Sequence, residues 1–322
     1  MAVCLLAILY PVLRCLGTER CNEAPYGGFD SRLSVVPVGQ VPIEGNQVVG
    51  FEVIRDKPVV AFPHRLLAVT PKGVVSWTSV DEVTRIAADD KARVLIQTSK
   101  GIASTGQGNS FESVATLSNA IHGELFDSGN TNVLSLVGGS SARPTFVSIR
   151  PNGTIGSSLE LQDPVRAVSW GTQGLSLIAG FTLMEWPTGS SKISLLGADK
   201  GFAHAEDTCL LGPDMVVVAL PNVVAVVSKE TTSIIVTMSA RVRCAGDTLY
   251  LLDLKTGIIA KATGADKLGH KDANAQYARD LIANLPQNVT ERDPRLLEAA
   301  RILGCKQALE LLGNRLPPVG HP

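Results

Sequence analysis

The chain has 322 residues, and its 29 Lys and Arg residues nearly balance its 30 Asp and Glu residues, so the formal net charge is −1. A neutral chain is not expected to bind nucleic acid, because that binding depends on a basic surface. Hydrophobic residues make up 45% of the sequence, which excludes an intrinsically disordered protein. The 30 glycines and 18 prolines are near average usage, which excludes collagen-like and low-complexity chains. The length allows one large domain or two ordinary ones.

An apolar run from Ala2 to Leu13 precedes the first charged residue. The run is shorter than the roughly 20 residues that a transmembrane helix needs, and it has the length of the hydrophobic region of a signal peptide. Small residues at Cys15 and Gly17 suit cleavage before Thr18, so the sequence predicts a signal peptide over residues 1–17. The alternative is a buried β-strand, because no basic residue precedes the run. The predicted location is secreted, periplasmic or the lumen of the secretory pathway, with the cytoplasm as the alternative.

The cysteines and histidines do not form a metal-binding motif. No pair of cysteines has CxxC spacing and the histidines are scattered, so no metal site is predicted. Cleavage after residue 17 would leave four cysteines, enough for two disulfide bonds of undetermined pairing. Two sequons, at Asn152 and Asn288, predict glycosylation if the chain enters a eukaryotic secretory route. A turn explains Asn152 equally well.

Short runs rich in Val, Ile and Leu, separated by turn residues, fill residues 30–264. Each run has the length of a β-strand, and none continues with a helical period. This density of strands is typical of sandwiches, barrels and propellers. Examples of these runs are Val59–Phe62, Leu66–Val69, Val94–Gln97, Met215–Leu220, Val223–Val227 and Leu249–Leu254.

Several strand pairs are joined by a short polar turn that ends in glycine, at Gly73, Gly153, Gly189 and Gly257. Glycine suits a tight hairpin because it accepts a positive φ. The spacing of the hairpins indicates a repeat of about 40 residues with four strands, which is typical of a propeller. The sequence therefore predicts a mainly β chain with a β-propeller of about five to six blades over residues 30–264. A sandwich array is the structural alternative.

Two of these hairpins, Arg65–Trp77 and Gly246–Ile259, carry a resemblance to known repeats. Each has a strand, a turn ending in glycine and a second strand, which resembles the repeats of quinoprotein-like (PQQ-like) and WD40-like propellers. The resemblance covers about 27 of the 322 residues and implies an architecture, because propellers have many functions. Quinoprotein dehydrogenases need an adjacent pair of cysteines, which the chain lacks, so no cofactor is predicted.

After Gly264 the pattern becomes helical, over residues 268–315. A first helix runs from Lys271 until Pro286 stops it. Asp293 and Pro294 then suit the N-cap and the first position of a second helix, which Gly304 splits. The sequence predicts a short C-terminal α-helical hairpin. It either caps the rim of the propeller or binds a partner through an apolar face that includes Leu296, Leu303 and Leu311.

No Walker A motif, GxSxG elbow or complete GxGxxG occurs in the sequence. Polar groups at blade edges converge on the central channel of a propeller, so acidic and histidine residues near strand ends are candidates for a ligand site. The proposed set is Asp127, His122 and His204. Other acidic residues near turns include Asp207 and Asp253. For each of them, the alternative is a role in capping a turn or a solvated charge.

The resulting functional hypothesis is a non-catalytic propeller that serves as a scaffold or protein-interaction subunit in complex assembly. It would bind one or more protein partners, would not bind nucleic acid, and would associate with membranes only through a partner. Two alternatives remain open. One is a cytosolic propeller-plus-solenoid subunit of a membrane-trafficking coat or tether, and the other is a propeller enzyme that acts on a small molecule or glycan in the central channel.

Overall fold

The computed structural model describes residues 28–312 except for 44–46, 80, 89–93, 99–100, 106–110, 116–124, 128–132, 138–144, 150–154, 161–162, 164, 172, 188–192, 287–288 and 290–292. The predicted signal peptide, residues 1–17, lies outside this range and stays a prediction. Among the described residues, no helix is both long and apolar enough to cross a membrane.

The described strands form six four-stranded antiparallel sheets. The first three sheets in chain order contain β2 (Gly50–Ile54), β3 (Lys57–Phe62), β4 (Arg65–Thr70) and β5 (Gly73–Thr78); β6 (Val83–Ala88), β7 (Val94–Thr98), β8 (Gly101–Thr105) and β9 (Phe111–Ala115); and β10 (Leu125–Asp127), β11 (Val133–Val137), β12 (Thr145–Ile149) and β13 (Ile155–Glu160).

The other three sheets complete the β-rich part of the chain. They contain β14 (Val165–Gly171), β15 (Gly174–Ala179), β16 (Thr182–Pro187) and β17 (Ser194–Ala198); β18 (Asp207–Gly212), β19 (Met215–Leu220), β20 (Val223–Ser228) and β21 (Thr232–Val236); and β22 (Ala240–Ala245), β23 (Thr248–Asp253) and β24 (Ile258–Thr263) together with β1 (Ser34–Gln40).

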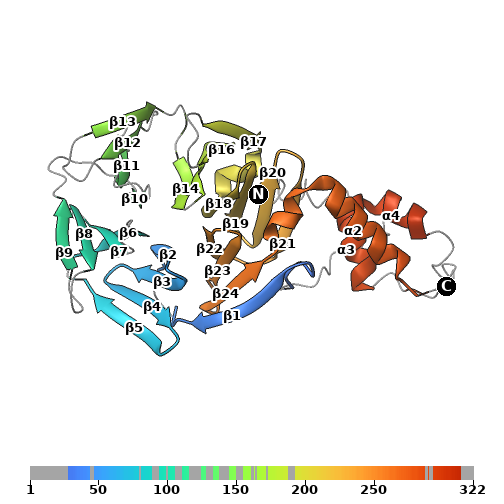
Figure 1. Cartoon of the computed structure of the whole chain (residues 1–322), viewed down its shortest axis with the longest axis horizontal. Helices are drawn as coiled ribbons and strands as arrows, with labels where there is room; N and C mark the ends of the chain where they lie inside the picture. Colours follow the sequence, from blue (N-terminus) through green and yellow to red (C-terminus); the bar gives the residue numbers. More distant parts are fainter. Residues whose placement is uncertain are drawn as a thin grey trace.

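The six sheets are arranged in a ring, and the innermost strand of each is β2, β6, β10, β14, β18 or β22 (Figure 1). Each innermost strand contacts the innermost strands of the two neighbouring sheets, in the order β2, β6, β10, β14, β18, β22 and back to β2. The prediction of a mainly β, propeller-like fold is confirmed. The arrangement does not match the alternative of a sandwich array, in which two sheets pack face to face.

One sheet contains both ends of the ring. β1 pairs antiparallel with β24, so the first strand of the chain completes the sheet formed by the last three strands. This sheet of β1, β24, β23 and β22 is called the closing sheet below. This pairing holds the ring closed without any covalent bond between its ends.

Apolar residues fill the space between neighbouring sheets. β15 is buried along its whole length. β19 and β20 are each buried except for a single residue at one end of the strand. A strand that is covered on both faces lacks the polar alternation of a half-exposed strand, which explains the continuous Val and Leu runs of the sequence. One core cluster joins the β18–β21 sheet to the closing sheet, and another joins the closing sheet to the β2–β5 sheet.

Gly257 occupies the turn beside this closure, where the sequence predicts a residue with positive φ. Its φ is 73°, its carbonyl accepts a hydrogen bond from the Val41 amide at 3.0 Å, and a Cβ atom there would lie 1.9 Å from the Val41 carbonyl oxygen. Gly73 likewise has a positive φ, of 116°. Gly153 and Gly189 lie outside the described residues.

A disulfide bond between Cys209 on β18 and Cys244 on β22 joins the innermost strands of two neighbouring sheets, with 5.6 Å between the Cα atoms. The sequence did not determine this pairing, because the two residues are 35 positions apart and only the ring brings their strands together.

After β24 the chain enters a short 3₁₀ helix, η2 (Ala265–Gly269), and then α2 (Lys271–Ala283), α3 (Pro294–Leu303) and α4 (Cys305–Leu312). Asp293 caps α3 by accepting a hydrogen bond from the Arg295 amide at 2.9 Å, as predicted. Gly304, with a φ of 85°, separates α3 from α4. The segment is therefore a group of three helices with its own apolar core, rather than the expected hairpin.

Asn274 on α2 connects this helical group to the ring. Its side-chain amide donates hydrogen bonds to the Leu268 carbonyl at 2.8 Å and to the Ser233 hydroxyl at 3.1 Å. In Figure 1, the three helices lie at one edge of the ring, beside β20 and β21.

We expect Gly257→Ala to lower the free energy of unfolding by about 2 kcal/mol more than the control Gly246→Ala. Both residues have positive φ, 73° and 61°, so both substitutions carry a backbone cost on the order of 1 kcal/mol. Only Gly257 would place its Cβ against a backbone oxygen, since no atom lies within 4 Å of the corresponding position at Gly246. Urea unfolding measures both changes, and equal losses would contradict this account of the closure.

We expect the double substitution of Cys209→Ser and Cys244→Ser to lower the free energy of unfolding by about 3–4 kcal/mol, since the bond closes a loop of 35 residues in the unfolded chain. Thiol titration of the denatured, unreduced protein tests the pairing directly. Reactive thiols at both Cys209 and Cys244 in the oxidised protein would contradict it.

Candidate active site at the centre of the ring

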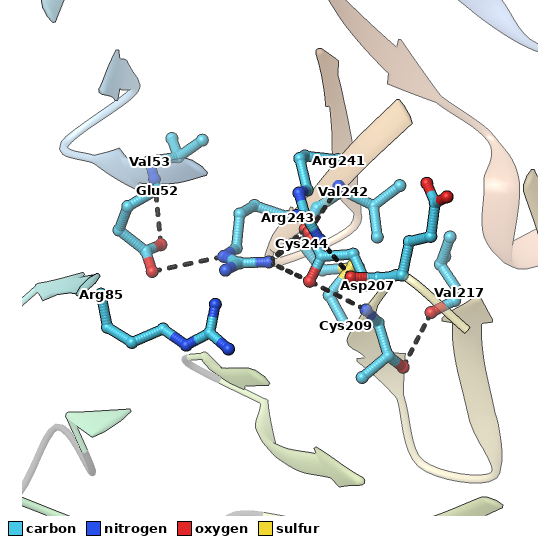
Figure 2. Close-up of polar contacts among 12 residues, drawn as sticks. Glu52, Val53, Arg85, Asp207, Cys209, Val217, Arg241, Val242, Arg243 and Cys244 are labelled. Carbon is cyan, nitrogen blue, oxygen red and sulfur yellow. Dashed lines mark hydrogen bonds and ion pairs between the residues drawn. A yellow bond between two sulfur atoms is a disulfide. The ribbon is translucent and has the colours of Figure 1, made fainter. Parts of the chain in front are cut away.

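Four of the innermost strands each place charged residues within an otherwise apolar sequence. The charged residues are Glu52 on β2, Arg85 on β6, Asp207 on β18, and Arg241 and Arg243 on β22. Charged side chains are seldom buried unless they are paired. Their position on the innermost strands brings them together where the sheets meet (Figure 2).

Arg243 links three sheets. Its Nη1 donates to both carboxylate oxygens of Asp207, at 2.8 and 2.9 Å, and its Nε donates to Oε2 of Glu52 at 3.3 Å. Figure 2 shows the guanidinium between the two carboxylates. The side chains of Arg243 and Glu52 are each 13% exposed, and that of Asp207 is 7% exposed. These ion pairs are therefore largely shielded from water, where charge interactions are stronger than at the surface.

Asp207 is held by its own strand and by the next sheet. The Thr208 amide donates to its Oδ1 at 3.0 Å, and the Val242 amide donates to its Oδ2 at 3.0 Å. Together with Arg243, these donors satisfy both oxygens of a carboxylate. The arrangement suits a fixed negative charge that orients Arg243.

Glu52 has a different environment. The Val53 amide donates to its Oε1 at 2.9 Å. Burial raises the pKa of Glu52 above its ordinary value, against the opposing effect of the nearby Arg243 charge, and Asp207 adds a smaller increase. A carboxyl group whose pKa is raised by burial keeps its proton to a higher pH than an ordinary carboxyl group does. Glu52 is thus the group at this centre best suited to acid–base chemistry.

Arg85 and Arg241 add positive charge around Glu52 and Arg243. Arg85 extends from β6 toward Arg243 in Figure 2, and its Nη1 donates a long hydrogen bond, 3.4 Å, to the Val49 carbonyl. Arg241 Nη1 donates to the Glu206 carbonyl. The buried Nε of Arg241 has no hydrogen-bond partner within the part of the chain that the structure describes.

The predicted channel site of Asp127, His122 and His204 stays a prediction. His204 is exposed at the end of a 3₁₀ helix, η1 (Lys200–His204), which precedes β18. Asp127 is the last residue of β10, and His122 lies outside the described residues. Asp207, which the sequence offered as one acidic residue among several, does reach the centre. Asp253 instead lies at the turn between β23 and β24, where it accepts a hydrogen bond from the Lys255 amide at 2.8 Å.

The remaining predicted residues lie elsewhere. Asn152 and Asn288 fall outside the described residues, so their glycosylation stays a prediction. Leu296 is fully buried in the core of the three helices, Leu303 packs partly against that core, and Leu311 is 44% exposed. Of the proposed partner-binding face, only Leu311 is largely accessible.

Sequence reasoning missed Glu52, Arg85 and Arg243. A usable signal was present, because each is a charged residue in a short, largely apolar strand: one in GFEVI, one in VTRIAA, and one of the two in ARVRCA. A charge in such a strand requires a buried partner. The sequence does not show which partner, because Glu52 and Arg243 are 191 positions apart.

The described residues at the centre do not fit a metal ion. No group of three or more His, Cys, Asp and Glu side chains suited to a metal occurs among the described residues. The two central carboxylates, Glu52 and Asp207, already share the guanidinium of Arg243, which lies between them (Figure 2).

No protein-family model and no curated protein matches the sequence. Solved structures do match the fold. A gluconolactonase from Xanthomonas campestris superposes with a TM-score of 0.52 and 11% identity, over 76% of this chain and 93% of that chain. A virginiamycin B lyase from Staphylococcus aureus gives 0.51 and 10%, over 69% and 82%. Regucalcin, a calcium-binding protein from Agrobacterium tumefaciens, gives 0.51 and 9%, over 71% and 94%.

These comparisons correct the functional hypothesis. The prediction of a non-catalytic scaffold is wrong, because the solved structures with this propeller-like fold include enzymes, and the lack of short catalytic motifs is therefore no argument against catalysis here. The likeness supports a propeller-like fold and not the quinoprotein-like or WD40-like kind in particular. At about one identical residue in ten, it shows the fold alone.

We expect the stability of the wild type relative to Glu52→Gln to fall as the pH rises from 4.5 upward. The raised pKa of Glu52 means that the folded protein binds this proton more tightly than the unfolded chain. The stabilisation is therefore complete below the ordinary value of 4.5 and is lost as the pH rises through the folded pKa, with a slope of at most about 1.4 kcal/mol per pH unit.

Urea unfolding of both proteins over a series of pH values measures this difference. Curves that stay parallel, or a wild type that gains stability over Glu52→Gln as the pH rises, would show that Arg243 keeps the carboxylate charged despite its burial.

Proposed function

We propose that the chain is a six-bladed propeller enzyme that acts on a small molecule at the centre of the ring by acid–base chemistry. The six four-stranded sheets and their closed circuit of innermost strands support six blades. The observation that carries the proposed activity is Glu52, a shielded carboxyl group with a raised pKa among arginines on the innermost strands.

In this proposal Glu52 transfers the proton. A general acid or base works best when its pKa lies near the working pH, and burial moves that of Glu52 in this direction. Arg243 is a positioning residue, because its Nε holds Oε2 of Glu52 at 3.3 Å while Asp207 fixes its Nη1. The free lone pairs of Glu52 remain for the substrate.

Arg85 provides the second part of the proposed mechanism, which is the stabilisation of negative charge. A guanidinium beside the reacting atoms stabilises negative charge that develops in the transition state. Such charge develops on the leaving oxygen of an ester, or on the oxygen of an enolate. The gluconolactonase of similar fold favours chemistry at a lactone, which is a cyclic ester. This is an argument from the fold, and it guides the choice of test substrates.

The Cys209–Cys244 disulfide supports an exported location for the proposed enzyme. Disulfide bonds persist in the periplasm, in the secretory lumen and outside cells, and they are rare in the cytosol. The predicted leader over residues 1–17 is consistent with the same route. N-terminal sequencing of the natural protein distinguishes the two locations, since export predicts a first residue at Thr18.

We expect the wild type to hydrolyse or eliminate at least one member of a panel of sugar lactones and cyclic esters, measured by proton release and mass spectrometry. Glu52→Gln should reduce kcat/KM by about 100-fold or more, in the range typical of a lost general acid–base group, because the amide cannot transfer the proton. The control Glu310→Gln removes the same charge from an exposed position on α4 and should leave kcat/KM unchanged.

A thermal melt of each variant shows whether a loss of activity comes from loss of folding. Turnover by Glu52→Gln equal to that of the wild type would contradict the proposal. Failure of the folded wild type to convert any compound in the panel would contradict it equally.

A further inference from the structure

The outer edge of the β2–β5 sheet differs from the outer edges of the other sheets. Each sheet of the ring ends on an outer strand, which is β5, β9, β13, β17, β21 or β1. The free edge of such a strand presents backbone donors and acceptors that can pair with another strand. Proteins usually block this pairing with a bulge, a charge or a proline.

The outer strands other than β5 are irregular where they pair with their neighbours. The register shifts between β1 and β24, β8 and β9, β12 and β13, β16 and β17, and β20 and β21, and in each pair the outer strand has the extra residue. β5 instead pairs with β4 in one unbroken register, from Thr70 and Gly73 to Arg65 and Thr78. Among the described strands, β5 is therefore the outer strand without a bulge.

β5 is also apolar and exposed. Its sequence, GVVSWT, contains no charged residue and no proline. Val74 and Val75 are 48% and 39% exposed, and every residue of the strand is exposed except the half-buried Trp77. In Figure 1, β5 lies at the outside of the ring, away from its centre. A regular apolar edge of this kind is suited to the addition of another strand.

The hairpin between β4 and β5 determines which backbone groups of β5 face outward. A turn of two residues joins Thr70 to Gly73, which are paired, and the pair that closes such a turn is hydrogen-bonded. Residues of an antiparallel strand then alternate between those bonded to the partner strand and those whose N–H and C=O groups point away from it. The residues whose backbone groups point outward are Val74, Ser76 and Thr78.

We propose that β5 pairs antiparallel with β5 of a second copy of this chain, about a two-fold axis at Ser76. In this register Val74 lies opposite the partner's Thr78, so outward-pointing groups meet and can hydrogen-bond, which joins two sheets into one. Val75 lies opposite the partner's Trp77. A β-branched side chain beside an aromatic ring is a favourable cross-strand pair.

The charges at the two ends of β5 favour a second copy as the partner. Lys72 precedes the strand and Glu82 follows it, and both are exposed. In an antiparallel pair of identical strands the start of one lies beside the end of the other, so Lys72 of each copy lies toward the partner's Glu82. Opposite charges attract over a Debye length of about 8 Å. A two-fold pairing uses the free edge of both copies, so association stops at the dimer.

Sedimentation velocity over a wide range of protein concentrations tests the proposal. We expect the wild type to show a reversible equilibrium of monomer and dimer, because two edge strands bury less surface than a permanent interface does. Val75→Lys should weaken the dimer about tenfold or more, since lysine on an edge hinders strand pairing. The matched control is Leu195→Lys, which changes a residue that is 60% exposed on the bulged strand β17. It should dimerise like the wild type.

Ser76→Pro tests pairing through the backbone. Proline removes an outward-pointing N–H, which an edge strand tolerates because the adjacent strand does not use that group. The dimer should again weaken about tenfold or more. In the wild type, the amides of residues 73–78 should exchange their hydrogens more slowly as the protein concentration rises. This dependence should be absent in Ser76→Pro.

An exchange of the two end charges tests whether the partner is a second copy. Lys72→Glu and Glu82→Lys should each weaken the dimer a few fold, because each places like charges together. The double variant reverses both charges and should restore the wild-type dimer. A partner of different sequence would not be matched again by this exchange.

A wild type that stays monomeric at every concentration would overturn the proposal, as would a dimer that Val75→Lys leaves unchanged. Equal weakening by Leu195→Lys, assembly beyond the dimer, or a double charge variant weaker than both single variants would overturn the two-fold pairing of β5. A thermal melt shows whether each variant is folded. If Ser76→Pro does not fold, Val75→Lys and the charge exchange decide. None of these measurements depends on the proposed activity.

Discussion

Closure of the ring is the constraint on which both the fold and the candidate site depend. The sheet of β22–β24 is completed by β1, so the two ends of the propeller meet in one sheet, and β22 of that sheet carries Arg243. Through Arg243 this sheet is tied to β2 on one side and to β18 on the other, and the Cys209–Cys244 bond reinforces the second contact. The central charges therefore exist as a group only when the ring is closed. Opening of the closing sheet would separate Glu52 from Arg243 and so remove the candidate site along with the fold.

The charges at the centre are not explained by stability alone. A largely buried ion pair loses its hydration, and replacement of such a pair by apolar residues of similar volume often leaves a protein equally stable or more stable. The neighbouring contacts of this ring, such as the clusters between the closing sheet and both its neighbours, show that apolar residues can join adjacent sheets here. Charged residues at Glu52, Arg85 and Arg243 therefore indicate a role that apolar residues could not fill. Binding a polar ligand or transferring a proton is such a role.

The sequence predicts local features well and the site poorly, for one physical reason. The turn at Gly257 and the cap at Asp293 depend on residues within a few positions of one another, and both are found as predicted. The continuous apolar strands are also local patterns of adjacent residues, and they predict a layered β fold. The centre instead joins residues on four innermost strands, with 191 positions between Glu52 and Arg243, and no periodic pattern connects them. In the C-terminal helices, Leu296 of the predicted apolar face lies in a core cluster that the three helices share.

This geometry also explains why short motifs reveal little about the centre of such a ring. A motif such as a nucleophile elbow places its catalytic group on one turn, so it can be read from adjacent residues. A propeller instead supplies its centre with one or two side chains from each innermost strand, at intervals set by the length of a blade. Five charged residues on four apolar strands then appear unrelated in the sequence, although ring closure makes them neighbours. For a chain of this architecture, an isolated charge in the first strand of a repeat is a more informative sign of a site than any short motif, because burial forces such a charge to have a partner.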